Sequence, residues 1–171
     1  PGSSSYKHYV VNNEMGKYTD VAKEAGLKHS GKESSAIVAD FDNDGDLDLF
    51  ISGRVKPSFY PKAVSSFIYR NDSKPGALKF TDVTKQSKIN SSEIGYGLGI
   101  AVSDINLDGW PDLYIGNDFH ENDYLYINQK NGTFTDENNQ RLMHTSKFTM
   151  GVDIADVNND GYPEIISTDM L

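Results

Sequence analysis

Short apolar segments alternate with polar turns along most of the chain. Each apolar run is only about three to five residues long and is bounded by Gly, Asn or Asp, a pattern typical of β-strands rather than helices. Apolar runs lie on both sides of three strongly acidic loops, so each loop is expected to join two neighbouring strands. The runs before the loops are 36–39, 98–102 and 151–155, and the runs after them are 47–51, 113–115 and 165–167.

Three sequence markers recur in the same order, which indicates an internal repeat. The first marker is the acidic loop, at 40–48, 104–112 and 156–164. The second ends in Asn after an apolar run, at 9–12, 68–71 and 125–128. The third ends in Thr-Asp, at 17–20, 79–82 and 133–136. With one strand before and one after each acidic loop, a repeat holds four short strands.

Four antiparallel strands in about 40 to 60 residues are typical of one blade of a β-propeller. The predicted fold class is therefore all-β, a β-propeller segment of about three four-stranded blades with calcium-binding hairpin loops. Helix is expected to be scarce, and the segment that most favours it is the turn from Val21 to Ala25, capped by Asp20 before it and Gly26 after it.

The phase of the repeat predicts how the chain divides. Residues 1–5 have the composition of a linker or cloning remnant, and residues 6–171 form a partial propeller. Within it we expect the last strands of one blade at 6–35, complete blades at 36–97 and 98–149, and the first strands of another blade at 150–171. Because closed propellers have about 4 to 8 blades, the chain is expected to be part of a longer propeller or to self-associate through its unfinished blades.

Composition narrows the choice of partners. The 171 residues carry a net charge of −9, so nucleic acid and anionic membranes are unfavourable partners. There is no cysteine, which excludes disulfides and thiolate zinc sites. No run approaches the roughly 20 apolar residues of a membrane span. Asp outnumbers Glu by 18 to 7, which favours acidic turns over helices.

The acidic loops have the composition of cation sites. Positions 1, 3 and 5 are Asp or Asn, position 6 is Gly and position 9 is acidic, so oxygen atoms at alternate positions of a tight turn can converge on one point. Hard oxygen ligands in a flexible loop suit Ca²⁺ better than Mg²⁺. The expected ligands, with a main-chain carbonyl at position 7, are Asp40, Asp42, Asp44, Asp46 and Asp48; Asp104, Asn106, Asp108, Trp110 and Asp112; and Asp156, Asn158, Asp160, Tyr162 and Glu164.

The charge distribution supports three such sites. The loops hold 11 of the 25 acidic residues, which leaves 14 acids against 16 bases elsewhere. About three bound Ca²⁺ ions would reduce the net charge to −3 and would do so where carboxylate repulsion is strongest.

Two alternatives compete with this interpretation. An EF-hand begins with the same spacing but needs Glu at position 12 and a helix on each side. Here position 12 is Ile51, Ile115 or Ser167, within expected strands. The other alternative is a set of Asp/Gly turns that bind no metal.

The loops and the markers between them resemble FG-GAP/VCBS repeats, the blades of integrin-α-like propellers. Segments 16–27 and 114–118 resemble more specifically the cartilage acidic protein/ASPIC-UnbV type, which includes large surface proteins of Bacteroidetes. The resemblance implies calcium in the hairpin between the first two strands of a blade, an extracellular, periplasmic or cell-surface location, and binding or adhesion. Glu164 departs from the usual Asp at position 9.

Other motifs carry less weight. Segment 26–33 nearly forms a P-loop but ends in Glu and precedes a strand. Glycines in 95–99 indicate close packing at an inner strand. Asp118, Glu121 and Asp123 could supply a carboxylate pair for glycoside cleavage, but a solvated polar turn is the favoured interpretation.

The predicted function is a non-catalytic, calcium-binding scaffold for protein recognition or adhesion, and not an enzyme. A glycan-binding module is the alternative, with exposed aromatics such as Phe59 and Tyr60 as its surface. An accessory domain of a polysaccharide-degrading enzyme is the weaker third hypothesis.

Overall fold

A computed structural model describes residues 11–14, 16–28, 32–56 and 58–170. Residues 6–10 and 29–31, and the linker expected at 1–5, lie outside the described residues. The structure contains two four-stranded antiparallel sheets flanked by two hairpins. The hairpins are β1 (Val11–Glu14) with β2 (Lys17–Asp20), and β11 (Thr149–Ala155) with β12 (Glu164–Asp169).

Both four-stranded sheets follow chain order, so each strand pairs with the next along the chain. The first sheet consists of β3 (Lys32–Ala39), β4 (Asp48–Val55), β5 (Phe67–Asn71) and β6 (Phe80–Asp82). The second consists of β7 (Gly97–Ser103), β8 (Asp112–Asn117), β9 (Tyr124–Asn128) and β10 (Phe134–Asp136). This architecture confirms the all-β fold class with blades of the β-propeller type.

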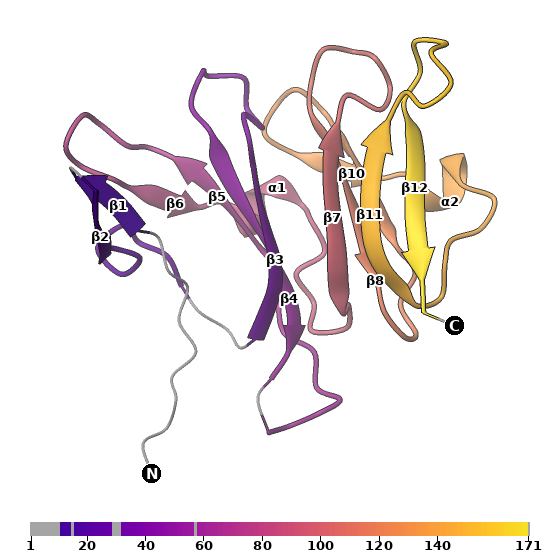
Figure 1. Cartoon of the computed structure of the whole chain (residues 1–171), viewed down its shortest axis with the longest axis horizontal. Coiled ribbons are helices and arrows are strands. Elements are labelled where there is room, and N and C mark those ends of the chain that lie inside the picture. Colours follow the sequence, from indigo (N-terminus) through magenta and orange to yellow (C-terminus); the bar gives the residue numbers. More distant parts are fainter. Residues whose placement is uncertain (1–10, 15, 29–31, 57, 171) are drawn as a thin grey trace.

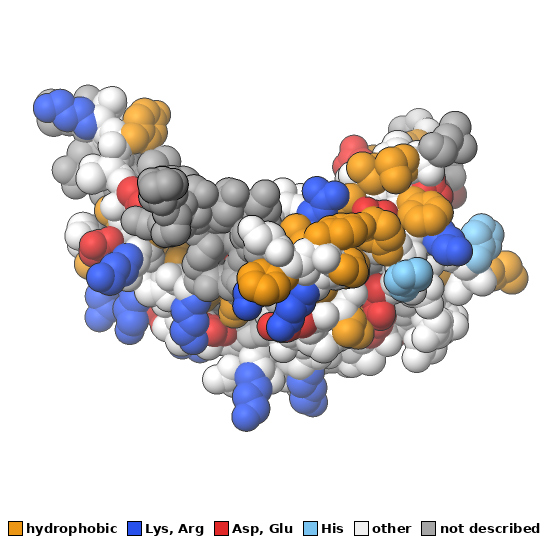
Figure 2. Space-filling model, turned by 90° about the horizontal axis from the view of Figure 1, so that it is seen from below, with side chains coloured by type: hydrophobic (Ala, Val, Ile, Leu, Met, Phe, Trp, Pro, Cys, Tyr) orange, Lys and Arg blue, Asp and Glu red, His pale blue; other side chains and the backbone are white. Residues whose placement is uncertain are grey.

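The sheets lie side by side and form an open arc (Figures 1 and 2). The main apolar core lies between the two four-stranded sheets, where Phe50 and Leu113 are fully buried. A second cluster, around Tyr114 and Leu125, packs against Ile165 of β12. Among the described residues, no helix is long and apolar enough to cross a membrane.

Glycines allow the inner strand β7 to approach its neighbours closely. A Cβ atom at Gly97 would lie 2.0 Å from the Ser52 Oγ atom of β4, and one at Gly99 would lie 2.8 Å from the main-chain nitrogen of Val152 in β11. The glycine-rich segment 95–99 therefore serves close packing, as the sequence indicated.

A tyrosine on the third strand anchors the preceding connection in both complete sheets. The Tyr69 hydroxyl accepts a hydrogen bond from the Lys28 N–H at 3.1 Å, and the Tyr126 hydroxyl accepts one from the Asn90 N–H at 2.9 Å. Both donors follow the Thr-Asp marker of the previous repeat, so this bond fastens successive repeats together.

The helix expected from Val21 to Ala25 is wrong, because the structure has a hydrogen-bonded turn there. Gly26 has φ of +88°, and the Leu27 N–H donates a hydrogen bond to the Ala22 carbonyl at 3.0 Å. These features end the segment after a single turn. Short helices instead occupy the equivalent places of the next two repeats, as α1 (Thr84–Ser87) and α2 (Asn138–Arg141).

Candidate metal-binding loops

The three acidic loops lie at the same end of the molecule, each between the first and second strands of its sheet or hairpin (Figure 1). They follow one backbone course. Position 4 has a left-handed conformation in every loop, and position 6 is a glycine with φ between +85° and +96°. The position-4 residues are Asn43, Leu107 and Asn159.

The position-1 carboxylate closes each loop by accepting two backbone N–H groups. Asp40 accepts the N–H of Asp44 and of Gly45, both at 3.0 Å. The matching bonds in the other loops join Asp104 to Asp108 and Gly109, and Asp156 to Asp160 and Gly161. The acidic residue at position 1 is therefore structural as well as a candidate ligand.

The position-9 carboxylate joins the loop to its sheet. Asp48 accepts the Phe41 N–H at 3.0 Å and the Asn71 N–H of β5 at 2.9 Å. Asp112 is bonded in the same way to the N–H groups of Ile105 and Asn128, at 3.0 and 2.8 Å. The side-chain amide of this third-strand Asn also donates to the position-8 carbonyl of the loop in both sheets, which accounts for the recurring Asn marker.

The third loop is bonded differently at position 9. Glu164 accepts the Val157 N–H at 2.9 Å, but its other oxygen accepts the Asn158 side-chain amide at 2.8 Å. Its longer side chain therefore turns back onto its own loop.

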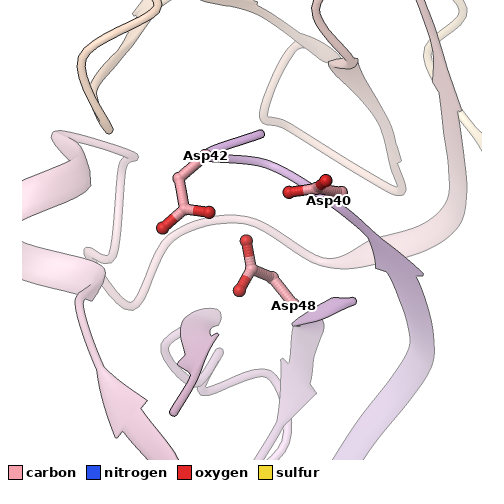
Figure 3. Close-up of side chains that lie close together, drawn as sticks. All are labelled: Asp40, Asp42 and Asp48. Atoms are coloured by element: carbon pink, nitrogen blue, oxygen red, sulfur yellow. The ribbon is translucent and has the colours of Figure 1, made fainter. Parts of the chain in front are cut away.

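The first loop brings three carboxylates together. One oxygen each from Asp40, Asp42 and Asp48 lie within 4.8 Å of one another, and the side chains point into the space between them (Figure 3). The Asp42 Oδ1 atom is buried and has no hydrogen-bond partner among the described residues. A buried carboxylate oxygen without a donor is costly unless a cation faces it.

The electrostatics of the first loop agree with this geometry. Burial, with Asp42 and Asp44 nearby, raises the pKa of Asp48 to about 6. Burial and Asp44 also raise the pKa of Asp42. The carboxylates thus disfavour ionisation when no cation is close. The donor set, three converging carboxylates in a tight loop, fits a hard divalent cation such as Ca²⁺.

The second loop directs its side chains differently. The Asn106 amide donates to Asp108 Oδ2 at 3.0 Å, and the Lys130 ammonium lies 3.3 Å from the same oxygen. The positively charged Lys130 side chain thus lies beside the position-5 carboxylate of this loop. In the third loop Asp156, Asn158 and Asp160 are all exposed.

The position-5 and position-7 residues share one contact in all three loops. The position-5 carboxylate accepts the N–H of the position-7 residue at 2.9 to 3.0 Å. The pairs are Asp44 with Asp46, Asp108 with Trp110, and Asp160 with Tyr162. Strands flank every loop, with Ile51, Ile115 and Ser167 inside β4, β8 and β12, so these are not EF-hands.

A cavity of about 320 Å³ opens beside the first loop, between the two four-stranded sheets. Asp42 and Asp48 line one side with Arg70, and Phe41 and Phe134 form part of an apolar wall. The candidate cation position is therefore reachable from a cleft rather than sealed within the core.

The interpretation of Asp118, Glu121 and Asp123 as a solvated turn is wrong for two of the three residues. Asp118 and Asp123 are 3% and 0% exposed. Asp123 accepts hydrogen bonds from the Asn117 N–H and the Tyr114 hydroxyl, both at 2.7 Å, and one from the Thr149 hydroxyl at 3.1 Å. Because Thr149 belongs to β11, this carboxylate links two adjacent sheets.

Comparison with known proteins agrees with the repeat structure. Residues 104–167 match a family described as FG-GAP-like repeat. Integrin alpha-3 of Mus musculus is 29% identical over 97 residues, which are 49% of this chain and 9% of that protein. Integrin alpha-7 of Homo sapiens is 37% identical over 82 residues, which are 42% of this chain and 7% of that protein. The matches therefore span less than a tenth of these relatives.

The match over 104–167 contains two of the three acidic loops and the last three strands of the second sheet, β8, β9 and β10. The match begins at the second acidic loop and ends just after the third, so it spans one interval of the loop marker. Residues 104–167 are therefore similar to an FG-GAP-like repeat, and part of the chain is similar to integrin alpha chains.

Proposed function

We propose that the chain is a calcium-stabilised, non-catalytic propeller scaffold for recognition or adhesion outside the cytoplasm. The observation that carries the proposal is the convergence of Asp40, Asp42 and Asp48 with a buried Asp42 oxygen that lacks a donor. A cation at this point would relieve repulsion between the carboxylates and fix the hairpin.

About three Ca²⁺ ions are proposed, one for each acidic loop. The loop-one ligands would be Asp40, Asp42, Asp44 and Asp48 with the Asp46 carbonyl. The corresponding sets would come from positions 1, 3, 5, 7 and 9 of the other loops. The shared backbone course supports equivalent sites, although the side chains converge most closely in the first loop.

Binding energy at these loops would add to folding stability, because an ion that binds only the folded loop shifts the folding equilibrium. Similarity to integrin alpha chains supports a protein ligand and an extracellular, periplasmic or cell-surface location. The rigid sheets would then present connecting loops to that ligand.

A glycan ligand is the second candidate, favoured by an aromatic pocket at the end opposite the acidic loops. Tyr60, Tyr96 and Phe119 line a cavity of about 510 Å³, and the Tyr60 and Phe119 rings lie 6.0 Å apart. Tyr60 is 66% exposed. Figure 2 looks onto this end and shows hydrophobic side chains gathered beside basic ones. Exposed aromatic rings can pack against sugar faces as well as protein side chains.

Thermal unfolding tests the metal proposal. The melting temperature should rise by roughly 5 to 10 °C between chelator and calcium at about 100 times the dissociation constant, and by less in equal magnesium. The Asp42→Asn variant should lose much of the calcium response, whereas Asp153→Asn, outside the loops, should retain it. A melting temperature that ignores both calcium and chelator would contradict stabilising sites.

A glycan array separates the two ligand classes. Binding that Tyr60→Ala abolishes without lowering the melting temperature would favour the glycan ligand. If no glycan on the array binds and stability depends on calcium, the protein ligand remains the favoured proposal.

A further inference from the structure

Four aromatic side chains form one connected group at the end of the molecule opposite the acidic loops. The Phe119 ring packs edge-to-face against Tyr60 and Tyr96, with ring centroids 6.0 and 5.4 Å away. Phe148 packs on the same ring at 6.5 Å. The four residues lie in the β4–β5 loop, the segment before β7, the β8–β9 loop and the segment before β11, so the group joins loops of three successive repeats.

The central residue of this group has a strained backbone. Phe119 adopts a left-handed conformation with φ of +71°, which is uncommon for an aromatic residue. The neighbouring rings hold its side chain in place. Residues kept in such conformations cluster at ligand-binding sites, because the surrounding structure must compensate for their strain.

The β4–β5 loop presents Tyr60 on a well-anchored backbone. The Lys56 N–H donates to the Lys62 carbonyl at 2.7 Å, and the Lys62 N–H donates to the Phe59 carbonyl at 2.7 Å. Ala63, which follows directly, is only 2% exposed, whereas Tyr60 is 66% exposed. The loop is thus fixed at its base while its aromatic tip faces solvent, so a ligand that packs on it loses little binding energy to ordering of the loop.

Three basic side chains surround these rings. Arg54 lines the aromatic cavity of about 510 Å³. The Lys56 Nζ atom lies 5.1 Å from the centroid of the Phe59 ring, and the Lys147 Nζ atom lies 5.8 Å from that of Phe148. Among the described residues, none of these three cations forms an ion pair with an acidic side chain. Figure 2 shows basic side chains around the hydrophobic group on this face.

The four rings and the three cations, which together we call the basic–aromatic patch, have a charge opposite to that of the other end. The acidic loops hold 11 of the 25 acidic residues and lie at the far end of the strands. The field of the molecule therefore directs an anionic ligand toward the patch, although the net charge of the chain is −9.

The residues of the cavity distinguish between classes of anionic ligand. Glu33 lines the same cavity as Arg54. A carboxylate accepts hydrogen bonds from sugar hydroxyls, but it repels the closely spaced charges of a nucleic acid or a strongly acidic peptide. Lys is depleted in protein–protein interfaces, and two of the three cations here are Lys. These features favour a sugar that carries an anionic group.

We propose that the basic–aromatic patch binds an acidic glycan, whose sugar units carry carboxylate or sulfate groups. Tyr60 packs against the apolar face of a sugar ring, and Glu33 accepts its hydroxyl groups. Arg54 and Lys56 bind the anion through charge-assisted hydrogen bonds. The inference rests on the proposed recognition function and names its ligand class, but it requires no ion at the acidic loops.

Titration with three hexasaccharides tests the ligand class. Oligogalacturonate carries carboxylates alone, a κ-carrageenan hexasaccharide carries sulfates alone, and maltohexaose is neutral. At physiological ionic strength in calcium, at least one acidic hexasaccharide should bind about tenfold more tightly than maltohexaose. The tighter of the two acidic ligands identifies the anion that the patch recognises.

Matched variants test the residues of the patch. Tyr60→Ala, and separately Arg54→Gln with Lys56→Gln, should each weaken binding of that hexasaccharide about tenfold, because a ring face or two cations are lost. Tyr60→Phe keeps the ring and should bind as the wild type does. Lys74→Gln with Lys79→Gln removes two cations from the β5–β6 turn, at the acidic-loop end, and should leave binding unchanged. Melting temperatures show that each variant is folded.

The contrary outcomes separate this inference from the metal proposal. Binding of neither acidic hexasaccharide at millimolar concentration would overturn the inference, whereas a calcium-dependent melting temperature would still support the metal sites. Equal affinity for a polyglutamate peptide or for hexathymidylate would overturn it in favour of a general attraction to anions. A loss of binding in the Lys74 and Lys79 double variant as large as in the Arg54 and Lys56 double variant would do the same.

Discussion

The first and second acidic loops share a backbone but differ in what their side chains do. In both loops the position-1 and position-9 carboxylates accept hydrogen bonds from equivalent N–H groups. In the first loop Asp42 points toward Asp48 and one of its oxygens lacks a donor, whereas in the second Asn106 donates to Asp108 beside Lys130. Positions 1, 6 and 9 thus share their backbone contacts and conformation in both loops, and we expect any difference in cation affinity to arise at position 3 and its surroundings.

The largest effect is expected where loop and sheet meet. Asp48→Ala should lower the free energy of unfolding by roughly 3 kcal/mol in calcium at pH 7, because the Phe41 and Asn71 N–H groups both lose a carboxylate acceptor and the ion loses a ligand. Asp112→Ala should have a similar effect in the second loop. Urea unfolding measures both, and Asp48→Asn, which keeps one acceptor oxygen, should lose less. Losses below about 1 kcal/mol for both alanine variants would contradict the conclusion that the position-9 carboxylate stabilises both loops.

Calcium stabilisation should depend on pH through Asp48. Its folded pKa of about 6 lies above the ordinary 3.8, so the metal-free fold holds this proton more tightly than the unfolded chain does. Metal-free stability from this group is therefore full below about pH 4 and is lost as pH rises to about 6, by at most about 1.4 kcal/mol per unit.

Because calcium competes with that proton, the gap between the calcium and chelator melting temperatures should widen from pH 4 to 6 and level off above about pH 6. The Asp48→Asn variant is the control. Its difference in melting temperature between calcium and chelator should change less with pH. A gap that narrows over this interval would contradict the role of Asp48.

Exchanging position 3 should exchange the affinities of the two loops. Asp42→Asn should weaken calcium binding at the first loop about tenfold, equivalent to about 1.4 kcal/mol, because a charged ligand is lost. Without calcium it should not lower stability, since a buried carboxylate under repulsion is removed.

The reciprocal change, Asn106→Asp with Lys130→Gln, should strengthen the second loop by a similar factor. Calcium titration of each variant measures the affinities, with Asn106→Asp alone separating the contribution of Lys130. Unchanged affinities in both loops would show that position 3 does not distinguish them.

The smallest expected effect concerns the left-handed residue at position 4. Leu107 has φ of 58°, a conformation that Asn adopts at lower cost. Leu107→Asn should raise the free energy of unfolding by about 1 kcal/mol without changing calcium affinity, and Asn43→Leu should lower it by about the same amount. Equal stabilities for the wild-type chain and both variants would show that the loops do not differ in backbone strain at position 4.

Much of the fold was predictable because its markers record backbone contacts. The Asn marker recurs because the side-chain amide of Asn71 or Asn128 donates to the position-8 carbonyl of its acidic loop, and the Thr-Asp marker recurs because Asp82 and Asp136 each accept an N–H two residues later. Because such contacts occur in both complete repeats, they leave a periodic trace in the sequence.

Contacts that occur in one repeat alone left no comparable trace. Lys130 comes from the β9–β10 turn, 22 residues after Asp108, and Asp123 lies in a polar segment that Tyr114 and Thr149 bury from neighbouring strands. The ligand residues were proposed from spacing alone. Spacing could not show that Asp42 faces Asp48 while Asn106 turns to Asp108, because side-chain direction depends on these tertiary neighbours.

Isothermal titration of the decalcified chain with CaCl₂ tests the central claim most directly. The account predicts about three ions per chain, with the tightest site weakened by Asp42→Asn and no comparable binding of magnesium. Absence of saturable calcium binding at millimolar concentration, or binding unaffected by Asp42→Asn together with Asp40→Asn, would contradict it.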